Sequence, residues 1–432
     1  MAILDLLCSM QISTKRICVF AFVIASITTQ AQIKLLCYNL LNFPTGNLQG
    51  RADTLKNIID YTRPHLLMIQ ELKTAEGLQE ITDVMNEIGY GDFSHPEFIP
   101  QQSPGSPLNL LQQSIVYDTE IFRLKSAGVV LTDYRDINEY ILYLNDPMLA
   151  SGADTTFLYT YVTHLKSSTG TDNEQARLSM VNYLIDHFQT LPEGSHVIFS
   201  GDFNLYNNTE PAYLAITNPD NPIVMRDPLS SLGNWAGTTF AHKEILTQST
   251  RSSTIFDDGA GGGVDDRFDF IMLSESLMNQ ASALAYTLDS FRSVGNTGNC
   301  YNQSITECDL GNEVPIDVLQ SIYYMSDHIP QYCELHSDII DHIVYSKAND
   351  ECSIRIQGNI QSDHITYQIE GSHPGDWSLE VRNVQGQMIM SQSGINARSG
   401  QLNISSLPQG IYFLNAKSAV MQLAAQKFVV VR

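Results

Sequence analysis

Six short apolar runs between residues 33 and 330 end in, or contain, polar side chains that can carry chemistry. In chain order these are Asn39, Glu71, His164, Asp202 with Asn204, Asp269, and Asp327 with His328. Strand ends let a rigid scaffold present functional side chains on the loops that follow. One such residue alone is more often a turn or a cap than a ligand. Six in one chain argue against a purely structural role for all of them.

The same region alternates between strand-like and helical segments. Residues 33–39 and 66–70 are predicted to be buried strands, and further strands, rich in β-branched and aromatic residues, are predicted at 114–117, 140–144, 157–164, 196–200 and 268–273. Residues 51–62, 78–88 and 173–188 have the apolar spacing of amphipathic helices. Because strand and helix do not alternate regularly, the pattern predicts an α+β sandwich.

The polar residues fit metal-assisted attack on a phosphate ester. The two-residue period of a strand places Asp202 and Asn204 on one side of the chain. Four carboxylates and two amides form an oxygen-rich set that suits Mg²⁺, Mn²⁺ or Ca²⁺. Phosphoryl transfer needs charge neutralisation, a base for water and an acid for the leaving oxygen. His164 and His328 could supply both proton transfers, and the sequence does not decide which is acid and which is base.

The charge of the chain restricts how it could meet such a substrate. The formal net charge is −23, with 24 Lys and Arg against 47 Asp and Glu. Non-specific binding to nucleic acid depends on Lys and Arg. A basic clamp for nucleic acid is therefore not expected, and a polyanionic substrate would need bound cations to offset the repulsion.

Residues 1–31 are predicted to be a signal peptide. Lys15 and Arg16 precede an apolar run at residues 17–27, and small residues follow at 29–31. The run is too short to span a bilayer, although an uncleaved anchor is the alternative. The chain could start at Met1 or at Met10. No stable membrane insertion is expected, because no other long apolar run exists.

Five cysteines remain after the signal peptide, and none forms the Cys-x-x-Cys pair typical of zinc sites. Cys300 and Cys308 bracket a short polar loop and are candidates for a disulfide after export. The glycine-rich residues 257–263 lack the Lys-Ser/Thr of a phosphate-binding P-loop. They are predicted to form a mobile loop, and their position before Asp269 leaves a gating role open.

Composition divides the chain into a larger unit at residues 33–337, a polar linker at 338–351 and a second unit at 352–432. A chain of 432 residues is expected to hold more than one domain. The second unit has short strand-like runs separated by turn residues, which predicts a small all-β sandwich.

The motifs of the larger unit resemble, in kind and in order, those of the endonuclease/exonuclease/phosphatase superfamily. They are Tyr38-Asn39, Gln70-Glu71, Thr163-His164-Leu165, Gly201-Asp202-Phe203-Asn204, Arg267-Phe268-Asp269-Phe270-Ile271 and Ser326-Asp327-His328. The resemblance implies a four-layer α/β–β/α sandwich, in which two β-sheets pack face to face with helices outside. It also implies divalent-metal-dependent hydrolysis of phosphate esters, but it does not specify the substrate.

The resemblance also implies roles for individual residues. Glu71 is expected to ligate Mg²⁺, or Mn²⁺ or Ca²⁺ in its place, with Asn39 and Asp327 nearby. Asn204 and Arg267 are expected to bind substrate.

The same resemblance implies the catalytic roles. Asp202 and Asn204 are expected to position the attacking water. His328, oriented by Asp269, is expected to act as general base or to stabilise the phosphate. His164 resembles the second histidine of the deoxyribonuclease and sphingomyelinase branches.

The second unit resembles the sorting domains of the Bacteroidetes type nine secretion system. The resemblance rests on Gly386, a strand at 402–404, Leu407-Pro408-Gln409-Gly410-Ile411-Tyr412 and the closing residues 427–432. It implies passage through the outer membrane, with the secretion machinery as partner, and a secreted or cell-surface protein. A small carbohydrate- or cell-binding sandwich is the alternative.

The expected function is that of a secreted, monomeric endonuclease on DNA or RNA, acting by in-line attack of water. A sphingomyelinase-like hydrolase and a phosphomonoesterase are the alternatives within the superfamily. A non-catalytic surface-binding protein is the alternative from another class.

Overall fold

The structure is a computed structural model of the chain. It describes residues 31–45, 48–105, 111–230, 235, 242–254, 256, 258–308, 311, 313–337, 339, 353–356, 360–370, 377–383, 387–395, 398–417 and 426–431. The predicted signal peptide, apart from Ala31, and the predicted linker, apart from Ile339, lie outside the described residues.

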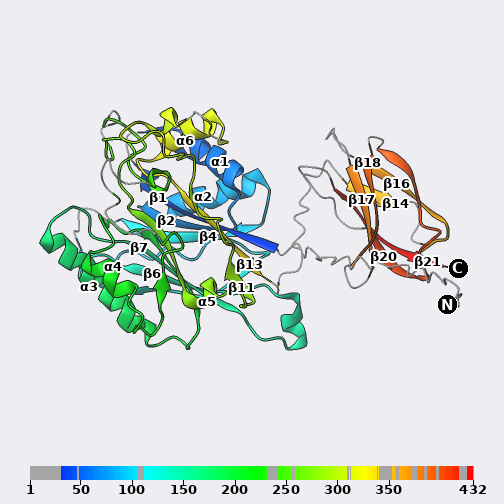
Figure 1. Cartoon of the computed structure of the whole chain (residues 1–432), viewed down its shortest axis with the longest axis horizontal. Helices are drawn as coiled ribbons and strands as arrows, with labels where there is room; N and C mark the ends of the chain where they lie inside the picture. The colour runs from blue at the N-terminus through cyan, green and yellow to red at the C-terminus, as the bar shows by residue number, and fades with distance from the viewer. Residues whose placement is uncertain are drawn as a thin grey trace, which may run out of the picture.

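Two mixed β-sheets form the centre of the larger unit (Figure 1). The first sheet has seven strands in the order β11-β13-β1-β2-β4-β3, with β12 also paired to β13. Its strands are β1 (Ala31–Phe43), β2 (Leu66–Leu72), β3 (Phe93–Ser94), β4 (Gln112–Asp118), β11 (Leu284–Tyr286), β12 (Arg292–Ser293) and β13 (Gln331–Ser337). The second has six, in the order β5-β6-β7-β8-β10-β9. They are β5 (Phe122–Val130), β6 (Ile137–Leu144), β7 (Phe157–His164), β8 (His196–Asp202), β9 (Met225–Arg226) and β10 (Asp269–Ser274).

The facing surfaces of the two sheets enclose a continuous apolar core. Leu35 and Cys37 enter it from β1 at alternate positions, and Val162 enters it from β7. The same two-residue period continues to Asn39 on β1 and to His164 on β7. The alternation that fills the core therefore carries polar residues to one end of the sandwich.

Helices cover the outer faces of both sheets (Figure 1). They are α1 (Arg51–Thr62), α2 (Ala75–Ile88), α3 (Thr171–Phe188), α4 (Pro211–Ile216), α5 (Glu275–Met278) and α6 (Ile316–Met325), with 3₁₀ turns η1 (Pro147–Ser151), η2 (Lys243–Ile245) and η3 (Ile305–Glu307). The helices α1, α2 and α6 lie on the side of the first sheet, and α3 and α4 on the side of the second. The larger unit therefore has the predicted four-layer α/β–β/α architecture.

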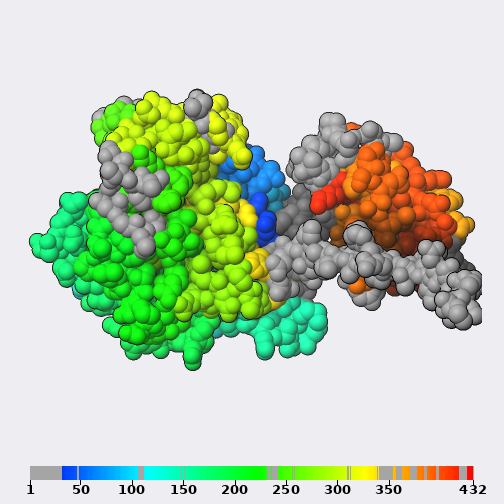
Figure 2. Space-filling view, viewed as in Figure 1, coloured from blue at the N-terminus to red at the C-terminus, as the bar shows by residue number. Residues whose placement is uncertain are grey.

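Segments distant in the sequence pack together in this arrangement. The α1 helix near residue 50 and the α6 helix near residue 320 are neighbours on the surface (blue and yellow in Figure 2). Asn57 on α1 donates from Nδ2 to the Ser321 hydroxyl on α6 at 2.9 Å. The two ends of the larger unit are likewise joined. Residues 31–37 of β1 pair with the whole of β13.

Local sequence explains where the helices begin and end. The Thr74 hydroxyl caps α2 by accepting from the Gly77 N–H at 3.0 Å, and Gly89 ends the helix in a left-handed conformation. Leu78, Ile81 and Met85 form the buried face. Among the described residues, no helix is both long and apolar enough to cross a membrane.

The C-terminal unit consists of two smaller sheets around their own core. A three-stranded sheet has the order β14-β16-β19, and a five-stranded sheet has the order β15-β21-β20-β17-β18. The strands are β14 (Ser353–Ile356), β15 (Ile360–Gln361), β16 (His364–Glu370), β17 (Trp377–Asn383), β18 (Met388–Ile395), β19 (Ser399–Asn403), β20 (Gly410–Lys417) and β21 (Gln426–Val430). Trp377, Leu414 and Phe428 are among the side chains of its core. The predicted all-β class of this unit is confirmed.

The predicted Cys300–Cys308 disulfide is present, with its Cα atoms 4.9 Å apart and both residues fully buried. Cys37 and Cys333 are buried free cysteines in β1 and β13.

We expect the double variant Cys300→Ser/Cys308→Ser to lose about 2 kcal/mol of unfolding free energy, because a short closed loop restricts the unfolded chain. Urea denaturation measures this change. Dithiothreitol should destabilise the wild-type protein and leave the double variant unaffected. Equal sensitivity of both proteins to the reductant would show that the disulfide does not form.

Candidate active site

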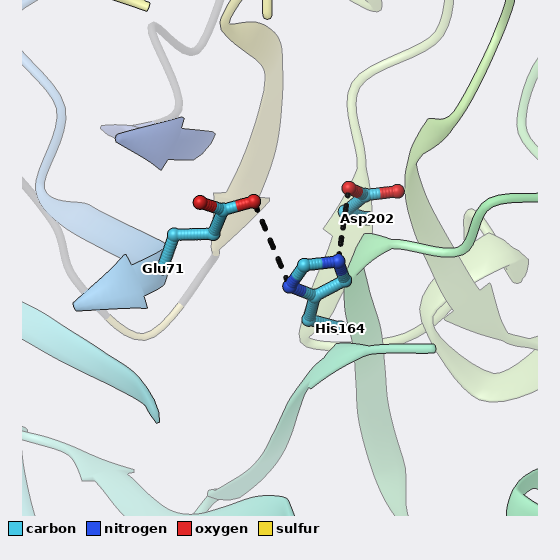
Figure 3. Close-up of side chains that lie close together, drawn as sticks. All are labelled: Glu71, His164 and Asp202. Atoms are coloured by element: carbon cyan, nitrogen blue, oxygen red, sulfur yellow. Dashed lines mark ion pairs between the residues drawn. The ribbon is translucent and has the colours of Figure 1, made fainter. Parts of the chain in front are cut away.

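Strand pairing brings the predicted site residues to one end of the inner core. In the parallel pair β7–β8, His164 lies opposite Asp202. In the antiparallel pair β8–β10, Asp202 lies opposite Asp269. Glu71 reaches the same place from β2 in the other sheet, so that its carboxylate, the His164 ring and Asp202 point toward one another (Figure 3).

Asn39 links the two sheets at this point. Its fully buried amide donates from Nδ2 to Glu71 Oε1 at 3.2 Å and to Asp202 Oδ2 at 3.1 Å. The same nitrogen lies 3.4 Å from His328 Nε2. The Asn39 oxygen accepts from the Leu41 N–H at 3.0 Å. Asn39 therefore holds two carboxylates that would otherwise repel each other, and metal ligation by Asn39 stays a prediction.

Glu71 and Asp327 form the acidic part of the site. Burial raises the pKa of Glu71, and the neighbouring Asp327 raises it further. The Asp327 Oδ2 atom accepts from the Ala260 N–H at 2.6 Å and from Gln248 Nε2 at 3.1 Å. Its Oδ1 atom is buried without a hydrogen-bond partner among the described residues. The buried, unpaired oxygen of Asp327 beside the largely buried Glu71 fits a bound cation.

Glu71, His164 and Asp202 offer a second set of donor atoms. One ligand atom of each lies within 4.8 Å of the others, a spacing that could hold a metal ion (Figure 3). The His164 Nε2 atom is 3.5 Å from Asp202 Oδ2, and its Nδ1 atom is 3.9 Å from Glu71 Oε1. Burial lowers the pKa of His164, and the Arg135 charge adds to the effect. The ring is therefore neutral, the form that ligates metals.

His328 and Asp269 form the predicted pair. The His328 Nδ1 atom lies 2.7 Å from Asp269 Oδ2, and both side chains are buried. Burial alone would lower the pKa of His328, but Asp269, Asp327 and Asp202 outweigh it and raise that pKa. The other ring nitrogen, Nε2, lies 3.6 Å from Asp202 Oδ2. A carboxylate on one nitrogen leaves the other directed into the site, as a general acid or base requires.

Asp202 is the last residue of β8, and Asn204 lies two residues further on. The Asp202 Oδ1 atom accepts from the Asn204 N–H at 3.1 Å, and Asn204 has a left-handed φ of 51°. Gly201 before them has a φ of 140°, and a Cβ there would lie 1.9 Å from the Thr163 oxygen. Only glycine allows β8 to approach β7 this closely, which places Asp202 beside His164.

Arg267 was predicted to bind substrate, and the structure places it elsewhere. Its guanidinium is fully buried and donates to both oxygens of Asp227, at 2.7 and 2.9 Å. It also lies 4.1 Å from the centre of the Phe270 ring. A paired, buried guanidinium supports the scaffold and cannot reach a substrate, so this prediction is corrected.

Two residues near the site were not predicted from the sequence. Arg135 donates from Nη1 to the backbone oxygens of His164 and Leu165, at 3.2 and 3.1 Å, and its charge acts on Glu71 and Asp202. The Nε2 atom of Gln248 lies 2.7 Å from the Nε2 atom of His328. Arg135 follows no apolar run and Gln248 lies in a polar stretch, so neither fitted the pattern of a strand ending in a polar residue.

The raised pKa of Asp202 has a consequence for stability. Burial raises this pKa from 3.8 to about 7, with His328 opposing the rise and Asp269 and Glu71 adding to it. The folded protein therefore keeps a proton that the unfolded chain loses between these pH values. Stability from this group is present at acid pH and declines as the pH rises toward 7.

We expect Asp202→Asn to flatten this decline and to raise the unfolding free energy at a pH of about 8 by about 1–3 kcal/mol. The measurement is urea denaturation at a series of pH values in the presence of a chelator. Asp53→Asn, an exposed change on α1, is the matched control and should keep the wild-type slope. An unchanged slope in Asp202→Asn would contradict the assignment.

Comparison with known proteins identifies the C-terminal unit. Residues 359–431 match the secretion system C-terminal sorting domain. The predicted sorting domain is thereby confirmed, and it marks the chain for secretion or for the cell surface. No curated protein matches the sequence.

Several solved structures are similar to the larger unit. The human Nocturnin catalytic domain with bound sulfate is 16% identical, and the match covers 72% of this chain and 96% of that chain at a TM-score of 0.46. An endonuclease/exonuclease/phosphatase from Bacteroides vulgatus is 14% identical, and the match covers 72% of this chain and 100% of that chain at a TM-score of 0.45. D. rerio TDP2 complexed with a single-strand DNA product is 16% identical, and the match covers 71% of this chain and 100% of that chain at a TM-score of 0.44. Likeness at this level does not by itself establish a shared activity.

Proposed function

We propose that the chain is an exported, divalent-metal-dependent hydrolase of phosphate esters. The observation that carries this proposal is the meeting of Asp202, Asp327 and the Asp269–His328 pair, all buried, with the largely buried Glu71. Buried acids at such density are unfavourable unless a cation offsets their charge. A phosphate group needs that same cation for its own charge.

The residues divide between holding the metal and moving protons. Glu71 would hold the metal with either Asp327 and Asn39 or His164 and Asp202, and the metal would supply charge neutralisation at the phosphate. Mg²⁺ prefers an all-oxygen set, whereas a histidine ligand favours Mn²⁺ over Mg²⁺. The two sets are therefore distinguished by which metal binds.

Proton transfer falls to Asp202 at the end of β8 and to His328, which precedes β13. Asp202, with a pKa near neutrality, can accept a proton from an attacking water. His328, with its raised pKa, can donate a hydrogen bond to the phosphate or to the leaving oxygen. Asn204 is placed by its N–H bond to Asp202 and would contact the phosphate. These roles permit in-line attack of water.

Nucleic acid, DNA or RNA, is the proposed substrate, and endonucleolytic cleavage the proposed reaction. Arg135 places a positive charge beside Glu71 and Asp202, which favours an anionic substrate. Because the net charge of the chain is −23, its surface as a whole repels a polyanion, and the attraction is limited to the site. A sphingomyelinase-like or phosphomonoesterase activity uses the same groups and remains the alternative.

We expect the purified chain to nick plasmid DNA or to cleave RNA with Mg²⁺ or Mn²⁺, and chelator to abolish the reaction. His328→Ala should lower the rate at least about 100-fold, because it removes a proton donor from the phosphate. His95→Ala is the control and should keep full activity, because this half-buried histidine contacts Gln79 on α2 and not the cluster.

Other substrates decide between the alternatives. Sphingomyelin and a phosphomonoester, tested under the same conditions, should be turned over more slowly than nucleic acid. Turnover of lipid alone would contradict the nuclease proposal and keep the hydrolase. No turnover of any substrate by a protein that binds the metal would favour a surface-binding protein.

A further inference from the structure

The glycine-rich loop (residues 258–263) is docked against the candidate site. The Ala260 N–H donates to Asp327 Oδ2 at 2.6 Å, and the Ala260 oxygen accepts from the Ser249 hydroxyl at 2.8 Å. Arg251 donates from Nη1 to the Asp258 oxygen at 3.1 Å and accepts from the Gly263 N–H at 2.9 Å. The loop is therefore held at several points along its length, in contrast to the mobile loop predicted from its composition.

The same loop reaches the other acidic residue through Asn42. The Asn42 side chain donates from Nδ2 to Asp258 Oδ1 at 3.1 Å. The Asn42 N–H donates to Glu71 Oε2, also at 3.1 Å. One short segment is thus connected to both acids, directly to Asp327 and through one residue to Glu71.

The glycines allow this close approach. Gly259 has a φ of +79°, and a Cβ there would lie 2.9 Å from Asp327 Cγ and 2.9 Å from Leu41 Cδ2. A Cβ on Gly263 would lie 2.2 Å from the Asn302 carbonyl carbon. Side chains at these positions would push the loop away from the carboxylate, so the composition follows from the packing.

The contacts also leave one oxygen of Asp327 available. The Asp327 Oδ2 atom has two donors, Ala260 and Gln248, whereas Oδ1 is buried without a partner in the part of the chain that the structure describes. The Glu71 Oε2 atom accepts from the Asn42 N–H, and its Oε1 atom accepts from Asn39 Nδ2. Hydrogen bonds to one oxygen fix the rotation of a carboxylate, and such outer contacts tune the affinity of a metal site.

We propose that the glycine-rich loop is a positioning element that fixes Asp327 and Glu71 for a divalent cation. This inference rests on the proposed function, because it assumes that these carboxylates bind the metal. Displacing the loop frees both carboxylates to rotate and weakens metal binding, even though no loop residue needs to touch the ion.

Gly259→Ala tests the inference, with Gly152→Ala as its matched control. Both glycines have a left-handed φ, +79° and +89°, but a Cβ at Gly152 has nothing within 4 Å. The two substitutions share the backbone strain and differ in the collision with Asp327. Calorimetric titration of Mn²⁺ into the purified chain without substrate is the measurement. Gly259→Ala should weaken binding about 10- to 100-fold, and Gly152→Ala should bind as the wild type does.

Asn42→Gly is the second variant. Its φ of 57° suits glycine, and the change keeps the N–H on Glu71 while removing the bond to Asp258. Weaker Mn²⁺ binding, by about tenfold, is expected in a protein with an unchanged circular dichroism spectrum. This variant keeps the inference testable if Gly259→Ala does not fold.

The outcomes separate the loop inference from the proposed function. Folded Gly259→Ala or Asn42→Gly protein with wild-type Mn²⁺ affinity would overturn the role of the loop and leave the hydrolase proposal intact. A wild-type protein that binds no divalent cation would overturn both. Weakened binding in both variants, with the control unchanged, supports the inference.

Discussion

The candidate site depends on four carboxylates gathered at one end of the inner core: Asp202, Asp269 and Asp327 are buried, and Glu71 is largely buried beside them. Burial favours the neutral forms of Glu71 and Asp202, and repulsion from neighbouring carboxylates adds to that preference. The raised pKa values of Glu71 and Asp202 express this cost. The protonated form of His328 offsets part of it from within the chain. A bound cation would offset more of this unfavourable free energy. We therefore interpret the clustered carboxylates as a site that binds a metal and a phosphate.

The cluster depends on the sandwich architecture, because neither sheet supplies all of its residues. Glu71 and Asn39 come from the first sheet, and His164, Asp202 and Asp269 from the second. The two-residue period that packs apolar side chains between the sheets also fixes the direction of the polar residues at their ends. Site geometry and core packing therefore depend on the same strand registers, and a shift of one residue would disrupt both.

Much of the fold and site could be predicted because the informative residues lie in or next to strands whose apolar patterns are visible in the sequence. The helix at residues 51–62 and the Asp269–His328 pair were predicted and are present. The resemblance assigned Arg267 to the substrate. Its pairing with Asp227, 40 residues away in sequence, could not be seen before the chain was folded. The docking of the glycine-rich loop likewise depends on Asp327, 67 residues from Ala260. Contacts of this kind arise only from the folded chain, and local composition does not reveal them.

The central claim is that the acidic cluster binds a divalent cation. A crystal structure of the chain grown with Mn²⁺ tests it most directly, through the anomalous signal of the metal. The account predicts one strong anomalous peak within about 2.0–2.4 Å of a Glu71 carboxylate oxygen, with either Asp327 or His164 and Asp202 as further ligands. A crystal that contains Mn²⁺ elsewhere, with no anomalous peak at Glu71, would contradict it.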